Sequence, residues 1–145
     1  MKIIVPCSSC YKINNVDLEK SLTARAICAN CKSYLPIHDG IQDVNGHTLK
    51  KLVASAKIPV AVDFWASWCG PCKSFSPIFH SVAQDIREHM IFAKFNTEQD
   101  QGASVTYNIR SIPTLIVFSN GVELDRQSGA MQKISLHTYL SRFIK

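Results

Sequence analysis

Apolar and polar positions alternate between strand-like and helix-like periods from about residue 47 onward. Residues 59–66, PVAVDFWA, form a nearly continuous apolar run of strand length, which indicates a strand covered on both faces. The pattern also predicts a strand over 90–96 and a hairpin over 114–128, where Asn120-Gly121 is a strong turn signal. Helical spacing of apolar residues predicts helices over 48–56, after Cys72, over 100–108 and around 136–143.

The predicted order of elements is α-β-α-β-α-β-β-α, which is typical of an α/β fold with a mixed central sheet and helices on both faces. Residues 1–35 lack this pattern: they hold four of the six cysteines, contain no Phe or Trp, and have too few large apolar side chains for a core. A segment this small needs a metal or a disulfide. Residues 36–46, PIHDGIQDVNG, are interpreted as a linker to a second domain over 47–145.

Composition narrows the choice of function. Hydrophobic residues make up 46% and charged residues 19% of the 145 residues, a globular profile. The net charge of +5 is scattered, so no nucleic-acid surface is indicated. No apolar run reaches the ~18 residues that span a membrane, and residues 1–5 are too short for a secretory signal. We therefore expect a cytoplasmic protein with no membrane partner, in which cysteines serve as metal ligands or redox catalysts.

The central cysteine pair, Cys69-Gly70-Pro71-Cys72, follows the buried strand and opens a predicted helix. Pro71 suits the first helical turn, and the helix N-terminus would stabilise a thiolate. Cys69, nearer the loop, is expected to be the exposed nucleophile, and Cys72 the resolving thiol. Asp63 is the lone charge of the strand, so burial should raise its pKa and suit it to proton transfer. A purely structural, hydrogen-bonded Asp63 is the alternative.

Two stretches, VDFWASWCGPCKSFSPIF and IRSIPTLIVFSNGVELDRQSGA, resemble the active-site segment and the C-terminal half of the thioredoxin family. The resemblance covers roughly residues 44–145. It implies a thioredoxin fold and a protein-disulfide reductase that is recycled by an NADPH-dependent thioredoxin reductase. It also implies a redox-active disulfide without bound nucleotide or flavin, disulfide-containing protein substrates, and a monomer.

The same resemblance assigns roles to further residues. Asp63 would be the buried acid that helps to deprotonate Cys72, and Lys94 the lysine near that acid, although an exposed strand lysine explains Lys94 equally well. Pro113 would follow a cis peptide bond beside the dithiol. The expected substrate groove is lined by Trp68, Gly70, Pro71, Ile112, Pro113 and Gly129, where backbone groups would pair with an extended substrate segment.

The two remaining pairs, Cys7/Cys10 and Cys28/Cys31, give the spacing C-x2-C-x17-C-x2-C, which is typical of a tetrahedral zinc site. We predict one structural zinc ion in a small zinc-ribbon-like module, with regulatory disulfides or iron as alternatives. His38 is a conceivable ligand but is interpreted as a solvated residue. Glycine often flanks such cysteines, whereas Tyr11 and Lys32 stand there in this chain.

Cysteines with identical spacing thus receive different predicted functions. The whole arrangement resembles the thioredoxins that carry an N-terminal zinc-binding extension. Two other hypotheses remain open: an oxidase or isomerase that uses the same dithiol, and a zinc-dependent binding module in which the second domain is a scaffold.

Overall fold

The computed structural model describes residues 1–144, so the last position of the domain predicted over 47–145 lies outside the described residues. The strands are β1 Lys2–Pro6, β2 Ile13–Asp17, β3 Ile37–His38, β4 Ile41–Val44, β5 Val60–Trp65, β6 Ile91–Asn96, β7 Thr114–Ser119 and β8 Val122–Ser128. The helices are α1 Gly46–Ser55, α2 Gly70–Ile86, α3 Gln101–Thr106 and α4 Lys133–Ser141, with a short 3-10 helix η1 at Lys20–Leu22. Within residues 1–144, no helix is both long and apolar enough to cross a membrane.

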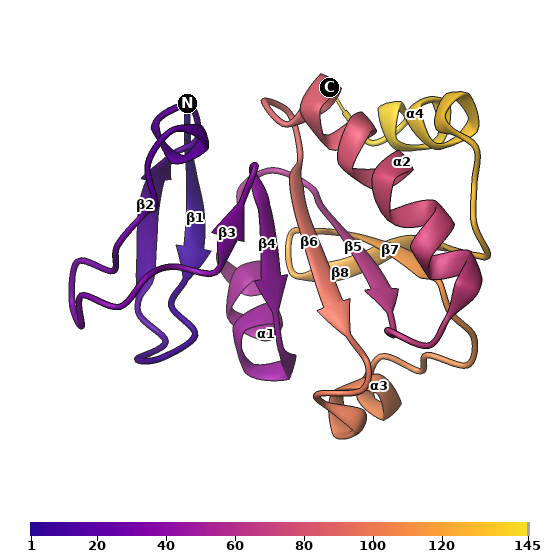
Figure 1. The fold of residues 1–145 in the computed structure, drawn as a ribbon, viewed down its shortest axis with the longest axis horizontal. Helices are drawn as coiled ribbons and strands as arrows, with labels where there is room; N and C mark the ends of the chain where they lie inside the picture. The colour runs from indigo at the N-terminus through magenta and orange to yellow at the C-terminus, as the bar shows by residue number, and fades with distance from the viewer. Residues whose placement is uncertain (145) are drawn as a thin grey trace.

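The central sheet has six strands in the order β3-β4-β6-β5-β7-β8. Strands β4, β6 and β5 are parallel, whereas β3, β7 and β8 each run antiparallel to their neighbours. Helices α2 and α4 pack on one face of this sheet, and α1 packs on the other (Figure 1). The predicted mixed sheet with helices on both faces, and with it the thioredoxin fold, is confirmed.

Strand β5 lies in the middle of this sheet, between β6 and β7, which explains its continuous apolar sequence. Val60, Val62 and Phe64 contribute to the core on the α1 side, whereas Ala61 belongs to the core on the α2 side. Alternation along the strand therefore directs Asp63 toward the α2 face, and its side chain is completely buried there. The strand ends at Trp65, four residues before Cys69, so the dithiol lies just beyond the carboxyl-terminal end of this central strand.

The prediction that residues 36–46 form a linker is wrong, because most of these residues belong to the central sheet. Strand β4 pairs in parallel with β6, and β3 forms a hairpin with β4. The turn residues Asp39 and Gly40 both have positive φ, at 53° and 81°, and Asp-Gly is a known hairpin signal. The strand was missed because it is four residues long and polar in its centre. Gln42 is nevertheless buried, and its side-chain amide donates a 2.9 Å hydrogen bond to the carbonyl oxygen of Ile4.

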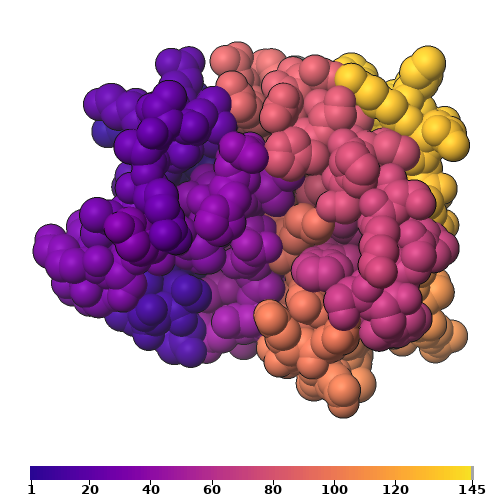
Figure 2. Space-filling model, in the orientation of Figure 1, coloured from indigo at the N-terminus to yellow at the C-terminus, as the bar shows by residue number. Residues whose placement is uncertain are grey.

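The N-terminal segment packs directly against α1 rather than standing apart (Figures 1 and 2). Its strands β1 and β2 form a separate antiparallel pair. The buried apolar side chains of this segment share one core with those of α1; they are Ile3, Val5, Val16, Leu18 and Leu35, against Leu49, Leu52 and Val53. Two further contacts join the segment to α1. Lys51 Nζ donates a 2.6 Å hydrogen bond to the carbonyl oxygen of Tyr11, and the ring centroids of Tyr11 and His47 lie 3.9 Å apart. The apolar side chains of the N-terminal segment are therefore buried against the larger domain and do not form a separate core.

Candidate active site and metal site

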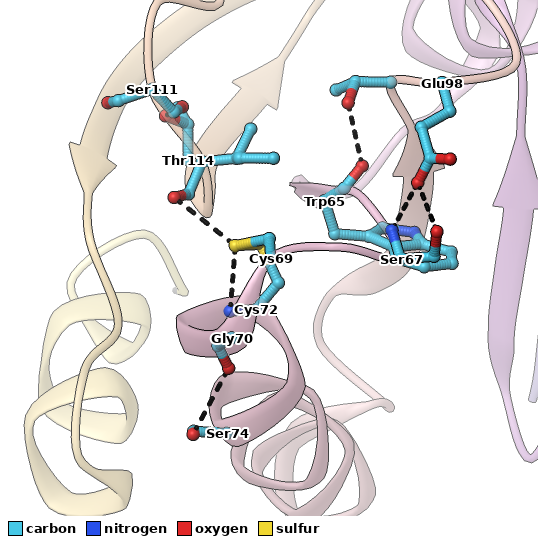
Figure 3. Close-up of a disulfide and its surroundings, with 11 residues drawn as sticks. Trp65, Ser67, Cys69, Gly70, Cys72, Ser74, Glu98, Ser111 and Thr114 are labelled. Atoms are coloured by element: carbon cyan, nitrogen blue, oxygen red, sulfur yellow. Dashed lines mark hydrogen bonds between the residues drawn. A yellow bond between two sulfur atoms is a disulfide. The ribbon is translucent and has the colours of Figure 1, made fainter.

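The central dithiol lies where β5 leads into α2 (Figure 3). Cys69 and Cys72 form a disulfide, and the Cys69 Sγ atom accepts a 3.2 Å hydrogen bond from the backbone N–H of Cys72. Cys69 is the N-cap of α2, and Pro71 lies in the first turn, where the sequence places it. Because the helix N-terminus carries partial positive charge, it stabilises a thiolate at this N-cap position once the disulfide is reduced.

The expected exposure of Cys69 is wrong for this oxidised form. Cys69 is 4% exposed and Cys72 is 2% exposed, so accessibility does not separate them. Cys69 is buried in a small apolar cluster with Ala66, against which Ile112 packs. Trp68, one residue earlier, is 72% exposed, as expected of a residue that is available to a substrate.

The second wall of the site comes from the loop before β7. The Ile112–Pro113 peptide bond is cis, the form that the resemblance implies. The carbonyl oxygen of Ile112 lies 3.7 Å from the Cys69 Sγ atom. Gly129 donates its backbone N–H to the carbonyl oxygen of Pro113 at 2.8 Å and has a φ of 93°, a conformation that favours glycine. Residues more than forty positions apart in sequence thus meet beside the disulfide.

Asp63 is buried on the same side of the sheet as α2, and within residues 1–144 neither carboxyl oxygen has a hydrogen-bond partner. Burial raises the pKa of Asp63 to about 7, and the positive charge of Lys94 opposes part of this effect. Lys94 is the register partner of Asp63 on β6, and its side chain is half-buried. Its Nζ atom donates a 2.6 Å hydrogen bond to Ser76 Oγ and lies 5.0 Å from the ring centroid of Trp65.

Sequence reasoning missed two groups at this site, Ser76 and the pair Ser67–Glu98. The Glu98 carboxylate accepts hydrogen bonds from the backbone N–H and from the hydroxyl of Ser67, and these bonds lower its pKa (Figure 3). Thr97 donates its N–H to the carbonyl oxygen of Trp65 at 2.9 Å. These contacts hold the loop that precedes Cys69. No local signal reveals them, because the partners are about thirty residues apart in sequence.

The four remaining cysteines form one cluster in the N-terminal segment. Their sulfur atoms all lie within 4.8 Å of one another, with Cys7 and Cys31 at 3.6 Å and Cys10 and Cys28 at 3.7 Å. A tetrahedral site with Zn–S bonds of about 2.3 Å would place its sulfurs about 3.8 Å apart, so the cluster fits a zinc ion. His38 lies outside this cluster, in β3, where its ring approaches Asp43.

Each cysteine pair sits in a tight turn of the same construction. The N–H groups of Tyr11 and Lys32 donate to the carbonyl oxygens of Cys7 and Cys28, and both have a φ of 66°. Non-glycine residues therefore occupy the left-handed positions that the sequence left in question. Such a conformation costs about 1–2 kcal/mol per residue, so the surrounding contacts must offset it.

Polar groups around the cluster favour thiolates. The backbone N–H of Cys31 and the side-chain amide of Asn14 lower the pKa of Cys28 to about 6. A side-chain hydrogen bond from Ser33 lowers the pKa of Cys31, whereas burial raises that of Cys7. Asn14, which the sequence did not single out, also accepts the N–H of Ala29 at 2.9 Å. Metal ligands need such outer partners, because these fix the orientation of the sulfur atoms.

Comparison with known proteins agrees with this geometry. The family model described as Thioredoxin matches residues 40–142. The chain belongs to the thioredoxin family. Thioredoxin C-3 of Corynebacterium nephridii is 35% identical over 141 residues, which cover 97% of this chain and 94% of that protein. Thioredoxin of Porphyra purpurea is 36% identical over 104 residues, which cover 72% of this chain and 97% of that protein.

Longer relatives match as well. The M-type chloroplastic thioredoxin of Spinacia oleracea is 37% identical over 114 residues, which cover 79% of this chain but 62% of that protein. As a thioredoxin, the chain is a dithiol–disulfide oxidoreductase, and its redox-active pair is Cys69 and Cys72. Family membership thus accounts for the central pair, whereas the other four cysteines are known from their geometry as a cluster that could hold a metal ion.

The burial of Asp63 predicts how the stability of this thioredoxin depends on pH. The native pKa of about 7 lies above the usual 3.8, so the native state binds more protons than the unfolded state between these values. The free energy of unfolding should therefore be highest below about pH 4 and fall as the pH rises to 7, by roughly 4 kcal/mol as far as this group is concerned. Asp63→Asn should remove this slope and stabilise the protein by about 2–4 kcal/mol at pH 8.

Urea unfolding of the wild type and of Asp63→Asn at pH 5 and pH 8 would test this expectation. Asp85→Asn is a suitable control, because the Asp85 carboxylate is partly exposed on α2 and pairs with Lys133 at 3.4 Å. The control should leave the pH slope unchanged. Equal pH slopes for Asp63→Asn and the wild type would contradict the assignment of the slope to Asp63.

Proposed function

We propose that this thioredoxin is a protein-disulfide reductase of the thioredoxin 2 type, with an N-terminal zinc-binding extension, in which Cys69 is the nucleophile and Cys72 the resolving thiol. The observation that carries the proposal is the position of Cys69 at the N-cap of α2, with its sulfur facing the Cys72 N–H and the Ile112 carbonyl. This arrangement supplies a stabilised thiolate, a second thiol one turn away and an adjacent backbone surface.

In the proposed reaction, the Cys69 thiolate attacks one sulfur of a substrate disulfide. A Cys69–substrate disulfide forms, and the other substrate sulfur leaves as a thiolate. Cys72 then loses its proton and attacks the Cys69 sulfur, which releases the second substrate thiolate. The substrate gains two electrons, and Cys69–Cys72 becomes a disulfide. We assign Asp63 as the acceptor of the Cys72 proton, because its pKa of about 7 allows it to take up and release a proton near neutrality.

Substrate binding is assigned to the surface around the dithiol. Trp68, Gly70 and Pro71 are exposed beside Cys69. The Ile112–Pro113 segment and Gly129 supply the facing wall. An extended polypeptide could pair with backbone groups there and rest on the Trp68 ring, so we propose disulfide-containing proteins as substrates.

We further propose that an NADPH-dependent thioredoxin reductase regenerates the dithiol of a monomeric, cytoplasmic protein. When insulin, NADPH and thioredoxin reductase are mixed with catalytic amounts of this protein, NADPH should be consumed in proportion to the insulin disulfides reduced. Omission of either the reductase or this protein should return consumption to background. Full activity with dithiothreitol but none with the reductase would reject the recycling partner and leave the exchange chemistry standing.

The proposed zinc ion would be held by Cys7, Cys10, Cys28 and Cys31. The separations of their sulfurs and the hydrogen-bond donors around them support this ligand set. When bound, zinc would cross-link the two turns of the N-terminal segment and would stabilise its fold. The alignment with Thioredoxin C-3 over 97% of this chain supports treating residues 1–35 as part of the thioredoxin architecture.

A further inference from the structure

A serine on α2 binds the lysine that faces the buried carboxyl group. Ser76 lies in the second turn of α2, and its Oγ atom accepts the 2.6 Å hydrogen bond from Lys94 Nζ. Lys94 and Asp63 are register partners on adjacent parallel strands, so their side chains leave the same face of the sheet. The ammonium group of Lys94 is nevertheless hydrogen-bonded to Ser76 on α2 and not to Asp63 on the adjacent strand.

A cation would stabilise the buried Asp63 carboxylate more than the Ser76 hydroxyl. Asp63 is completely buried, and within the described residues 1–144 both of its oxygens lack hydrogen bonds. An ionised carboxylate in such a site gains substantially from an approaching cation. The Ser76 hydroxyl is a neutral acceptor in a half-buried position, yet it is Ser76 that accepts the hydrogen bond from the Lys94 ammonium. The location of the Lys94 ammonium therefore modulates how easily Asp63 ionises, against the larger effect of burial.

We propose that Ser76 is a positioning residue that holds the Lys94 ammonium away from Asp63 and thereby tunes the proton affinity of this carboxyl group. The catalytic consequence rests on the proposed role of Asp63 in thiol–disulfide exchange. Without the hydroxyl, the ammonium would lose its acceptor on α2 and would turn toward the unpartnered carboxylate. Asp63 would then ionise at lower pH and bind the proton of Cys72 less tightly.

Neighbouring elements place further groups around Lys94 and Asp63. Asp43 of β4 is the second register partner of Lys94, but its carboxylate is 61% exposed and therefore already solvated. The register partner of Asp63 on β7 is the apolar Leu115. Helix α2 adds the dithiol and the exposed Lys73, and among the described residues 1–144 the charge that lowers the pKa of Asp63 is that of Lys94. Because a buried, unpaired carboxylate attracts a cation more strongly than a solvated one, the released ammonium should favour Asp63.

The test is the titration of Asp63 in the reduced protein, followed by the carbon-13 NMR signal of its carboxyl group and assigned with Asp63→Asn. In Ser76→Ala the titration midpoint should fall by about one pH unit, the lower end of the effect of an adjacent opposite charge. The matched control is Ser74→Ala on the same helix. Ser74 is exposed, and its hydroxyl donates to the carbonyl oxygen of Gly70 at 3.5 Å and not to Lys94 or Asp63, so its replacement should leave the midpoint in place (Figure 3).

A Lys94→Met background separates an electrostatic effect from a general change in packing. There the cation is absent, so adding Ser76→Ala should produce no further shift. An unchanged or raised midpoint in Ser76→Ala, or an equal downward shift in the Lys94→Met background, would overturn the proposal.

Rates of insulin-disulfide reduction, measured against pH on the same variants, address Asp63 itself. If the wild-type rate does not follow the Asp63 midpoint, the proposed proton-transfer role fails. The NMR comparison would still decide the role of Ser76.

Discussion

Replacing Cys69 by serine should reduce the rate of insulin reduction by on the order of a thousandfold or more, to the background rate. A serine hydroxyl at the N-cap of α2 can still accept the N–H of Cys72, so the fold should be retained. It cannot form the sulfur–sulfur bond on which electron transfer depends. The measurement is the turbidity or NADPH-coupled assay with insulin, together with circular dichroism to establish that the variant is folded.

The companion variant Cys72→Ser should still attack substrates but be unable to resolve the product. Stable mixed disulfides should then accumulate, and mass spectrometry should locate them at Cys69. Cys31→Ser is the control for a cysteine outside the central pair, and it should keep a measurable dithiol activity. Insulin reduction by Cys69→Ser at the wild-type rate would reject the mechanism, and partner binding that survives loss of both active-site cysteines but not loss of zinc would favour the scaffold hypothesis.

Removing the proposed zinc ion should unfold the N-terminal segment. Structural zinc sites contribute on the order of 10 kcal/mol to small modules, and the four cysteines are brought together from two turns that have little core of their own. The thioredoxin domain should remain folded at lower melting temperature, because the core beneath α2 and α4 contains no residue from positions 1–35. Its other face should lose the cover provided by Ile3, Val5 and Val16.

Metal analysis and thiol titration test this expectation directly. The reduced protein should contain one zinc ion and show two readily reactive thiols, and after denaturation in the presence of a chelator it should show six. Cys31→Ser should lose the metal, whereas a Cys69→Ser/Cys72→Ser double variant should retain it. A reduced, metal-free protein with the same melting temperature as the metal-loaded one would contradict a structural role for zinc.

The sequence was most informative where chemistry and hydrophobic pattern coincide. The apolar run of β5, interrupted by a single carboxyl group, predicted a strand covered on both faces and a buried Asp63, and the structure places this side chain on the α2 face. Cys-Gly-Pro-Cys after that strand predicted the start of α2. Spacing of the outer cysteines predicted their clustering, which the structure shows.

Prediction failed where residues depend on distant partners. Strand β4 contains the polar pair Gln42-Asp43 and was interpreted as part of a linker, yet Gln42 is buried because it donates to the Ile4 carbonyl oxygen, thirty-eight residues away. The N-terminal segment seemed to lack a core because its apolar residues are few. Its core is completed by α1, which no local count of side chains can reveal.

By itself, the sequence therefore determined the order of most elements, the redox pair and the four-cysteine set, because strand and helix periods and short cysteine spacings are local properties of the chain. Only the tertiary structure decided how the electrostatics of the site are arranged. It showed that within residues 1–144 the Asp63 carboxyl group has no hydrogen-bond partner, that Lys94 is hydrogen-bonded to Ser76, and that Cys69 is buried beside Ile112. Ionisation depends on solvation and on charges a few ångströms away, and those neighbours come from separate strands, a helix and a loop that folding alone brings together.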